Sequence, residues 1–134
     1  MSIEVRIVDG PLSEPAAPQA EPAWLGVAGA IVCFEGRVRA SENGRSIVAL
    51  DYEAYEPMAA QELHRLGEQL AREFALIGLI VAHSRGRIAV GECSFRLCIA
   101  AGHRKEALQA MDAYIARLKQ DVPIWKKPVY ADKE

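Results

Sequence analysis

Cysteine and histidine are scarce in this sequence of 134 residues, and their spacing excludes several kinds of site. The three cysteines, Cys33, Cys93 and Cys98, form no CxxC pair and cannot all pair with one another. Because they lie in apolar, strand-like segments, we interpret them as reduced core residues of a cytoplasmic protein. The three histidines are spread just as widely, so no metal-ligand spacing is present and we expect no metal site.

A strong charge of one sign and a long hydrophobic run are also absent. The formal net charge is −2, so the chain has no general basic surface for nucleic acid or an anionic membrane. The longest apolar run, Phe74–Ala82, is too short to span a bilayer. The first residues, Met1–Arg6, lack the basic start and apolar stretch of a secretory signal. We therefore expect a cytoplasmic protein without membrane segments, in which any anion binding is local.

Common nucleotide-binding and hydrolase motifs are missing as well. The sequence has no P-loop, no GxGxxG and no HExxH, and no serine or cysteine lies in a recognisable nucleophile context. A cysteine-based mechanism is therefore poorly supported, and no bound cofactor is implied.

The sequence does have enough apolar residues for a core. Hydrophobic residues make up 51% of the chain, and its length suits one domain, which we place at residues 1–134. An Ala-rich stretch holds four of the seven prolines, so we predict a loop over residues 9–24. These prolines are Pro11, Pro15, Pro18 and Pro22.

Hydrophobic periodicity predicts six strands and two long helices. Asn43–Gly44 marks a hairpin turn. One helix follows Pro57 and a second is opened by Gly102–His103, each with an apolar stripe. Because the strands arrive in hairpin order with two helices between them, we predict an α+β fold: a largely antiparallel sheet with two long helices packed on it (α/β-hammerhead-like). The predicted strands are 3–8, 29–39, 47–54, 77–82, 87–90 and 93–100, and the stripes are Ala59, Leu63, Leu66, Leu70 and Phe74, then Ala107, Met111, Tyr114 or Ile115, and Leu118.

Two pairs of basic residues are candidates for binding an anion. Arg37 and Arg39 are two residues apart, so on an extended chain they project from the same face, and each guanidinium matches phosphate oxygens. His103 and Arg104 fall where a strand gives way to a helix, and the N-terminus of a helix favours anions. The alternatives are a solvated strand edge for the arginines and exposed side chains in a capping turn for the second pair.

A third basic group brackets a break in the chain. We expect the second helix to end on Lys119, and Pro123 and Trp125 to form a turn before Lys126 and Lys127. Clustering and burial of cations favour the neutral amine, so a lysine here can act as a general base or nucleophile. A helix end followed by a basic surface turn is the alternative.

Helix geometry constrains how these groups combine. His103 and Lys119 lie at opposite ends of one helix, about 24 Å apart at the usual helical rise, so they cannot share one small-molecule site within a subunit. Either there are two sites, or a symmetric dimer brings His103 and Arg104 of one chain to Lys119 of the other, and we prefer the dimer. His83 ends a buried strand, and we interpret it as a hydrogen-bonded core or edge histidine rather than a ligand.

Several short blocks, each weak alone, occur in a specific order and spacing between about Gly29 and Lys127. They are Phe34–Arg39 with Asn43–Gly44, Leu50–Tyr55 before Pro57–Ala59, Val90–Glu92, His103–Arg104, Leu118–Lys119 and Pro123–Lys127. Together they resemble the large, catalytic subunit of molybdopterin synthase. One departure is Pro128, which stands where that family usually has a glutamate.

The resemblance implies a sulfurtransferase of molybdenum cofactor biosynthesis that converts cyclic pyranopterin monophosphate to molybdopterin by installing a dithiolene. Sulfur would come from a small ubiquitin-like carrier subunit whose C-terminal Gly-Gly ends as a thiocarboxylate. Two large subunits would form a central homodimer, with a carrier at each end of the heterotetramer.

The resemblance also implies roles for individual residues. Lys119 and Lys126 would be catalytic, and Phe34 would line the pocket. The substrate-binding positions would be Arg37, Val38, Arg39, His103, Arg104, Lys119, Lys126 and Lys127. Two other functions stay open: a non-catalytic anion-binding dimer, and a scaffold that holds a ubiquitin-like partner.

Overall fold

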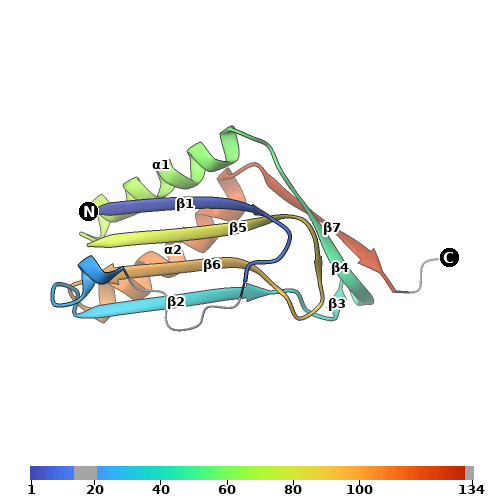
Figure 1. Cartoon of the computed structure of the whole chain (residues 1–134), viewed down its shortest axis with the longest axis horizontal. Coiled ribbons are helices and arrows are strands. Elements are labelled where there is room, and N and C mark those ends of the chain that lie inside the picture. Colours follow the sequence, from blue (N-terminus) through green and yellow to red (C-terminus); the bar gives the residue numbers. More distant parts are fainter. Residues whose placement is uncertain (14–20, 132–134) are drawn as a thin grey trace.

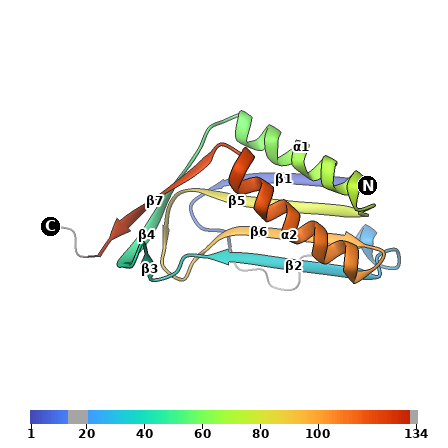
Figure 2. The same cartoon turned by 180° about the vertical axis from the view of Figure 1, so that it is seen from behind.

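The architecture is a seven-stranded sheet with two α-helices on one face of its larger part (Figure 1 and Figure 2). The computed structural model describes residues 1–13 and 21–131. Along the chain the elements are β1 (Ser2–Asp9), the 3-10 helix η1 (Pro22–Trp24), β2 (Ala30–Arg37), β3 (Ser41–Glu42), β4 (Arg45–Ala54), α1 (Met58–Glu73), β5 (Gly78–Ala89), β6 (Cys93–Ala101), α2 (Arg104–Asp121) and β7 (Ile124–Tyr130).

The sheet is largely antiparallel, as the sequence predicts. Its strand order is β2-β6-β5-β4-β3, while β7 pairs with β4 and β1 pairs with β5. Only the β1–β5 pair is parallel among the pairs of the described residues. Strands β3, β4 and β7 form a wing that crosses the end of the larger part, β1, β2, β5 and β6 (Figure 1).

A single long strand, β5, joins the larger part to the wing. Its first part pairs with β6 and β1, whereas Gly86–Ala89 pairs with β4. Gly86 at the junction has φ = +97°, a conformation that favours glycine. The sequence predicts two short strands here because polar residues interrupt the apolar pattern between them, but the backbone continues through the interruption.

The main core lies between the two helices and the larger part of the sheet. Helix α1 buries Ala59, Leu63, Leu66 and Leu70 of its predicted stripe. Helix α2 buries Ala107, Met111 and Tyr114 of its own stripe. A large apolar side chain contributes about 1.5–3 kcal/mol when it is fully buried, so these stripes fix both helices on the sheet.

The loop predicted over residues 9–24 is only partly correct. Asp9 belongs to β1, and Pro22–Trp24 form η1, whose proline suits the first turn of a helix. Trp24 is buried with Cys98 and Ala100 on the sheet face opposite the helices. Residues 14–20 of the predicted loop lie outside the described residues.

The turn predicted around Pro123 and Trp125 is wrong. Helix α2 continues past Lys119 to Asp121, and β7 then begins at Ile124 and runs antiparallel to β4. Pro128 fits into this strand because β7 is an edge strand that pairs only with β4 among the described strands. The basic cluster therefore lies on a strand whose neighbouring side chains point to opposite faces.

The cysteines differ in exposure. Cys93 and Cys98 are buried, as the sequence predicts, but Cys33 is exposed because it lies on β2 at the edge of the sheet. Within residues 1–13 and 21–131, no helix is both long and apolar enough to cross a membrane.

Candidate functional site

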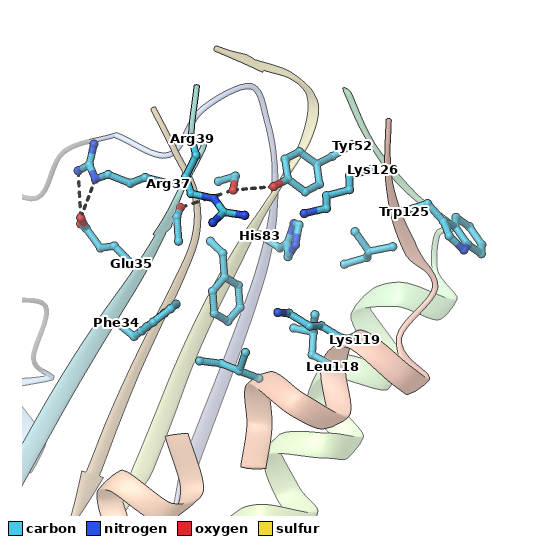
Figure 3. A pocket seen from close by; sticks show the side chains of 15 residues that line it. Phe34, Glu35, Arg37, Arg39, Tyr52, His83, Leu118, Lys119, Trp125 and Lys126 are labelled. Atoms are coloured by element: carbon cyan, nitrogen blue, oxygen red, sulfur yellow. Dashed lines mark hydrogen bonds and ion pairs between the residues drawn. The ribbon is translucent and has the colours of Figure 1, made fainter. Parts of the chain in front are cut away.

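A cavity of about 670 Å³ lies where the end of β2, the last turn of α2 and the start of β7 meet (Figure 3). Its walls combine aromatic and basic side chains. The lining residues are Phe34, Glu35, Gly36, Arg37, Arg39, Tyr52, His83, Ser94, Phe95, Ile115, Leu118, Lys119, Ile124, Trp125 and Lys126.

Three basic side chains reach this cavity from separate elements. Arg39 comes from the connection after β2, Lys119 from the last turn of α2, and Lys126 from β7 (Figure 3). Lys126 Nζ lies 3.5 Å from Glu42 Oε2, and its side chain is 50% exposed, so this ion pair holds the ammonium only weakly. Three cations around one hollow favour an anionic ligand.

Arg37 and Arg39 do not project together, contrary to the prediction. The β2–β6 register shifts between Gly36 and Arg37, which breaks the alternation of side chains. Arg37 donates to the Glu35 carboxylate at 2.9 and 3.1 Å and to the Gly91 carbonyl at 2.9 Å. Figure 3 shows its guanidinium turned toward Glu35, while Arg39 reaches toward the middle of the cavity. Arg37 therefore borders the cavity as part of an ion pair.

Val38 and Lys127 lie outside this cavity. Val38 is buried in a cluster of the wing with Ile47, Leu50 and Ile88. Lys127 is next to Lys126 on β7, so it points to the other face, where it lies opposite Asp51. Arg87, hydrogen-bonded to Asp51, and to a smaller extent Lys127 lower the pKa of the Asp51 carboxyl. In this arrangement the side chains of Val38 and Lys127 do not reach the cavity.

His103 and Arg104 border a different hollow at the other end of α2. It has a volume of about 690 Å³ and is also lined by Gly29, Gly102, Lys105 and Leu108. Its six lining residues include none of those around the first cavity. The structure of one chain thus separates the two basic groups, as the helix length predicts.

The aromatic wall of the first cavity combines Phe34, which the resemblance places in the pocket, and Trp125 with three residues that sequence reasoning did not assign to a site: Tyr52, Ser94 and Phe95. Phe34 contacts Phe95 edge-on, with ring centroids 6.0 Å apart. The Tyr52 hydroxyl lies 3.0 Å from Ser94 Oγ. Trp125 stands at the rim and is 58% exposed. These residues come from four strands, so no local sequence signal could have joined them.

His83 forms part of the same wall. It is buried and hydrogen-bonded, as predicted, but it also lines the cavity. Burial lowers the pKa of the His83 imidazole, so the neutral ring is favoured. Among the described residues, no group of three or more His, Cys, Asp or Glu side chains is arranged to hold a metal ion.

Comparison with known proteins identifies the family to which this chain is similar. The family model described as MoaE protein matches residues 12–121. The molybdopterin synthase catalytic subunit of Bacillus subtilis is 41% identical over 107 residues, which cover 80% of this chain and 68% of the relative. The human molybdopterin synthase catalytic subunit is 35% identical over 104 residues, covering 78% of this chain and 55% of the relative.

Solved structures agree with this assignment. The crystal structure of molybdopterin synthase from Staphylococcus aureus superposes with a TM-score of 0.78 at 30% identity, covering 96% of this chain and 92% of that one. A protein-protein complex of subunits 1 and 2 of molybdopterin-converting factor from Helicobacter pylori gives a TM-score of 0.70 at 25% identity, with coverage of 97% and 91%.

Proposed function

The chain belongs to the MoaE family of molybdopterin synthase catalytic subunits, and from this premise we propose that it transfers sulfur to cyclic pyranopterin monophosphate to form the dithiolene of molybdopterin. The sulfur donor is the C-terminal thiocarboxylate of a small ubiquitin-like carrier. We place this reaction in the cavity lined by Arg39, Lys119 and Lys126.

The convergence of three cations on one aromatic-walled cavity is the observation that carries this proposal. A substrate with a flat ring system and a phosphate needs apolar walls for the ring and positive charge for the phosphate. Phe34 and Phe95 supply the walls, and Arg39 offers a planar fork of donors to phosphate oxygens.

The two lysines are suited to the proton transfers of the reaction. When thiocarboxylate sulfur forms a bond to a substrate carbon, the carbon–oxygen bond of the substrate breaks and oxygen leaves as water, which requires protons. A second water then cleaves the acyl–sulfur bond, so the sulfur stays on the substrate and the carrier leaves with a C-terminal carboxylate. Lys119 and Lys126 line the cavity from α2 and β7, so one ammonium can donate a proton while the other stabilises negative charge. No cysteine is needed as a nucleophile, because the sulfur arrives on the carrier.

A second copy of the chain completes the site in this proposal. His103 and Arg104 are exposed at the far end of α2 and line a separate hollow. A symmetric dimer would bring them to the Lys119 side of the partner, where they would bind the substrate phosphate. A carrier at each end of this dimer gives a heterotetramer, which we place in the cytoplasm.

Substitution of Lys119 tests the catalytic assignment. With thiocarboxylated carrier and cyclic pyranopterin monophosphate, Lys119→Ala should lower dithiolene formation by about 100-fold or more, while carrier binding survives. Lys119→Arg is the matched variant: it retains the charge but its guanidinium does not give up a proton at neutral pH, so it should bind the pterin and turn over slowly. Unchanged turnover in Lys119→Ala would refute the assignment.

A further inference from the structure

The His83 ring is held rigidly in the wall of the cavity. The side chain is 5% exposed, and its ring centroid lies 5.2 Å from that of Tyr52 and 5.7 Å from that of Phe95. Both neighbours meet the ring at steep angles, 76° and 57°, so the imidazole is fixed between two aromatic residues. His83 lines the cavity together with the three basic residues, and Figure 3 shows it in the middle of the cavity wall.

One hydrogen bond defines which nitrogen of His83 carries the proton. Nδ1 lies 2.8 Å from the Ser84 carbonyl oxygen, and a carbonyl can only accept, so Nδ1–H is the donor. Because burial keeps the ring neutral, Nε2 has a free lone pair and is a hydrogen-bond acceptor. No hydrogen bond from the described residues reaches Nε2.

The other side-chain acceptors of the cavity wall already have protein partners. The Glu35 carboxylate accepts from Arg37 through one oxygen and from Arg96 through the other. The hydroxyls of Tyr52 and Ser94 bond to each other. The remaining polar side chains at the centre are cationic donors, so Nε2 is the side-chain acceptor of this wall that has no protein partner among the described residues.

We propose that His83 Nε2 accepts a hydrogen bond from a ring N–H of the pterin and thereby selects the heterocycle, while the basic residues bind the phosphate. A pterin carries N–H groups on its ring edge, which Arg39, Lys119 and Lys126 cannot satisfy because they have no acceptor atoms. A buried acceptor paired with a ligand donor discriminates strongly against ligands that lack the donor. This inference rests on the proposed function and adds a specificity residue to it.

A pair of amide substitutions separates the two nitrogens of His83. The glutamine side chain reaches as far as Nε2, whereas the asparagine side chain reaches only as far as Nδ1 and can retain the bond to Ser84. We expect His83→Gln to bind cyclic pyranopterin monophosphate within about threefold of the wild type, and His83→Asn to bind it about 10- to 100-fold more weakly. In turnover with thiocarboxylated carrier, the same loss should appear in KM for the pterin, with kcat and carrier affinity changed little.

The comparison has distinct negative outcomes. Equal loss of pterin affinity in both variants would show that His83 only packs the wall. No loss of pterin affinity in His83→Asn would show that Nε2 binds no substrate group. Either result overturns the inference, while activity of the wild-type protein still upholds the proposed function. A wild-type protein that neither binds nor converts the pterin would overturn both.

A measurement on the wild-type protein covers the case in which a variant does not fold. In protein labelled with ¹⁵N-histidine, saturation with the pterin should shift the Nε2 resonance of His83 as the acceptor becomes hydrogen-bonded. Inorganic phosphate should leave this resonance unchanged. An Nε2 signal that does not respond to saturating pterin contradicts the inference.

Discussion

Mixed dimers offer the sharpest test of a site shared between two chains. Lys119 and His103 lie at the two ends of α2, about 24 Å apart along the helix axis, and line separate hollows. If a pocket combines Lys119 of one chain with His103 of its partner, Lys119→Ala and His103→Ala homodimers each have two defective pockets. A dimer with one chain of each kind instead places both substitutions in one pocket and leaves the other intact.

The expected size of the recovery follows from counting pockets. When equal amounts of the two variants exchange subunits at random, about half of the dimers are mixed, and each mixed dimer has one intact pocket of two. Dithiolene formation should therefore recover to about one quarter of the wild-type rate at equal protein concentration. A recovery of this size does not arise from residual activity if each variant alone is at least about 100-fold slower than the wild type.

The assay mixes the variants under mild denaturation and refolding, adds thiocarboxylated carrier and pterin, and quantifies dithiolene product. Lys119→Ala mixed with Lys126→Ala is the matched control. Both lysines line the same cavity of one chain, so every mixed dimer has one substitution in each pocket and the rate should stay low.

Subunit exchange must be shown independently, by separating differently tagged chains. If mixed dimers form and the Lys119→Ala and His103→Ala mixture remains inactive, the shared pocket is refuted. Recovery in the Lys119→Ala and Lys126→Ala control would instead refute the placement of both lysines in one pocket, because those residues would then belong to different pockets.

Other expected outcomes concern stability, pH and thiol reactivity. Tyr114→Phe should lower the free energy of unfolding by about 1 kcal/mol in urea titrations, because it removes the buried 2.9 Å bond from the Tyr114 hydroxyl to the Leu63 carbonyl; no loss would show that this bond contributes nothing. Burial depresses the pKa of His83 below its usual 6.5, so the folded state takes up a proton less readily than the unfolded state. The stability that the neutral ring provides is complete above pH 6.5 and is lost as the pH falls below this value. Between about pH 7.5 and pH 5, the free energy of unfolding should therefore fall more steeply in the wild type than in His83→Gln. Parallel curves for the two proteins would contradict this expectation. Burial raises the pKa of the Cys98 thiol, so a thiol reagent should modify the exposed Cys33 first. Cys33→Ser should remove this fast reaction and retain dithiolene formation. Loss of dithiolene formation in Cys33→Ser would indicate a role for the cysteine in sulfur transfer.

Most secondary structure was predictable because it depends on local patterns. The apolar spacing of Leu63, Leu66 and Leu70 and the Asn43–Gly44 hairpin turn gave correct elements, since neighbouring residues alone define those patterns. The prediction failed at β7, where Pro123 and Trp125 were expected to form a turn. That segment is a strand because β4 offers it an edge to pair with, and nothing in the segment itself records its partner.

The candidate site was also predictable only in part. Its basic residues were visible in the sequence, because Arg39, Lys119 and Lys126 stand out by charge and position. Their grouping into one cavity depends on the return of β7 beside the end of α2. The register shift after Gly36 turned Arg37 toward Glu35, and the wing buried Val38 in its own core.

The sequence by itself therefore determined the strands and helices with strong periodicity, the absence of familiar nucleophile and nucleotide motifs, and the separation of His103 from Lys119 by the length of one helix. Only the tertiary structure decided which side chains share a wall. It placed His83 between Tyr52 and Phe95, residues far from each other in the chain, in the wall of a basic cavity, with Nδ1 hydrogen-bonded to the Ser84 carbonyl. The physical reason is that helix and strand patterns arise from neighbouring residues, whereas a pocket arises from pairings between strands that local sequence does not encode.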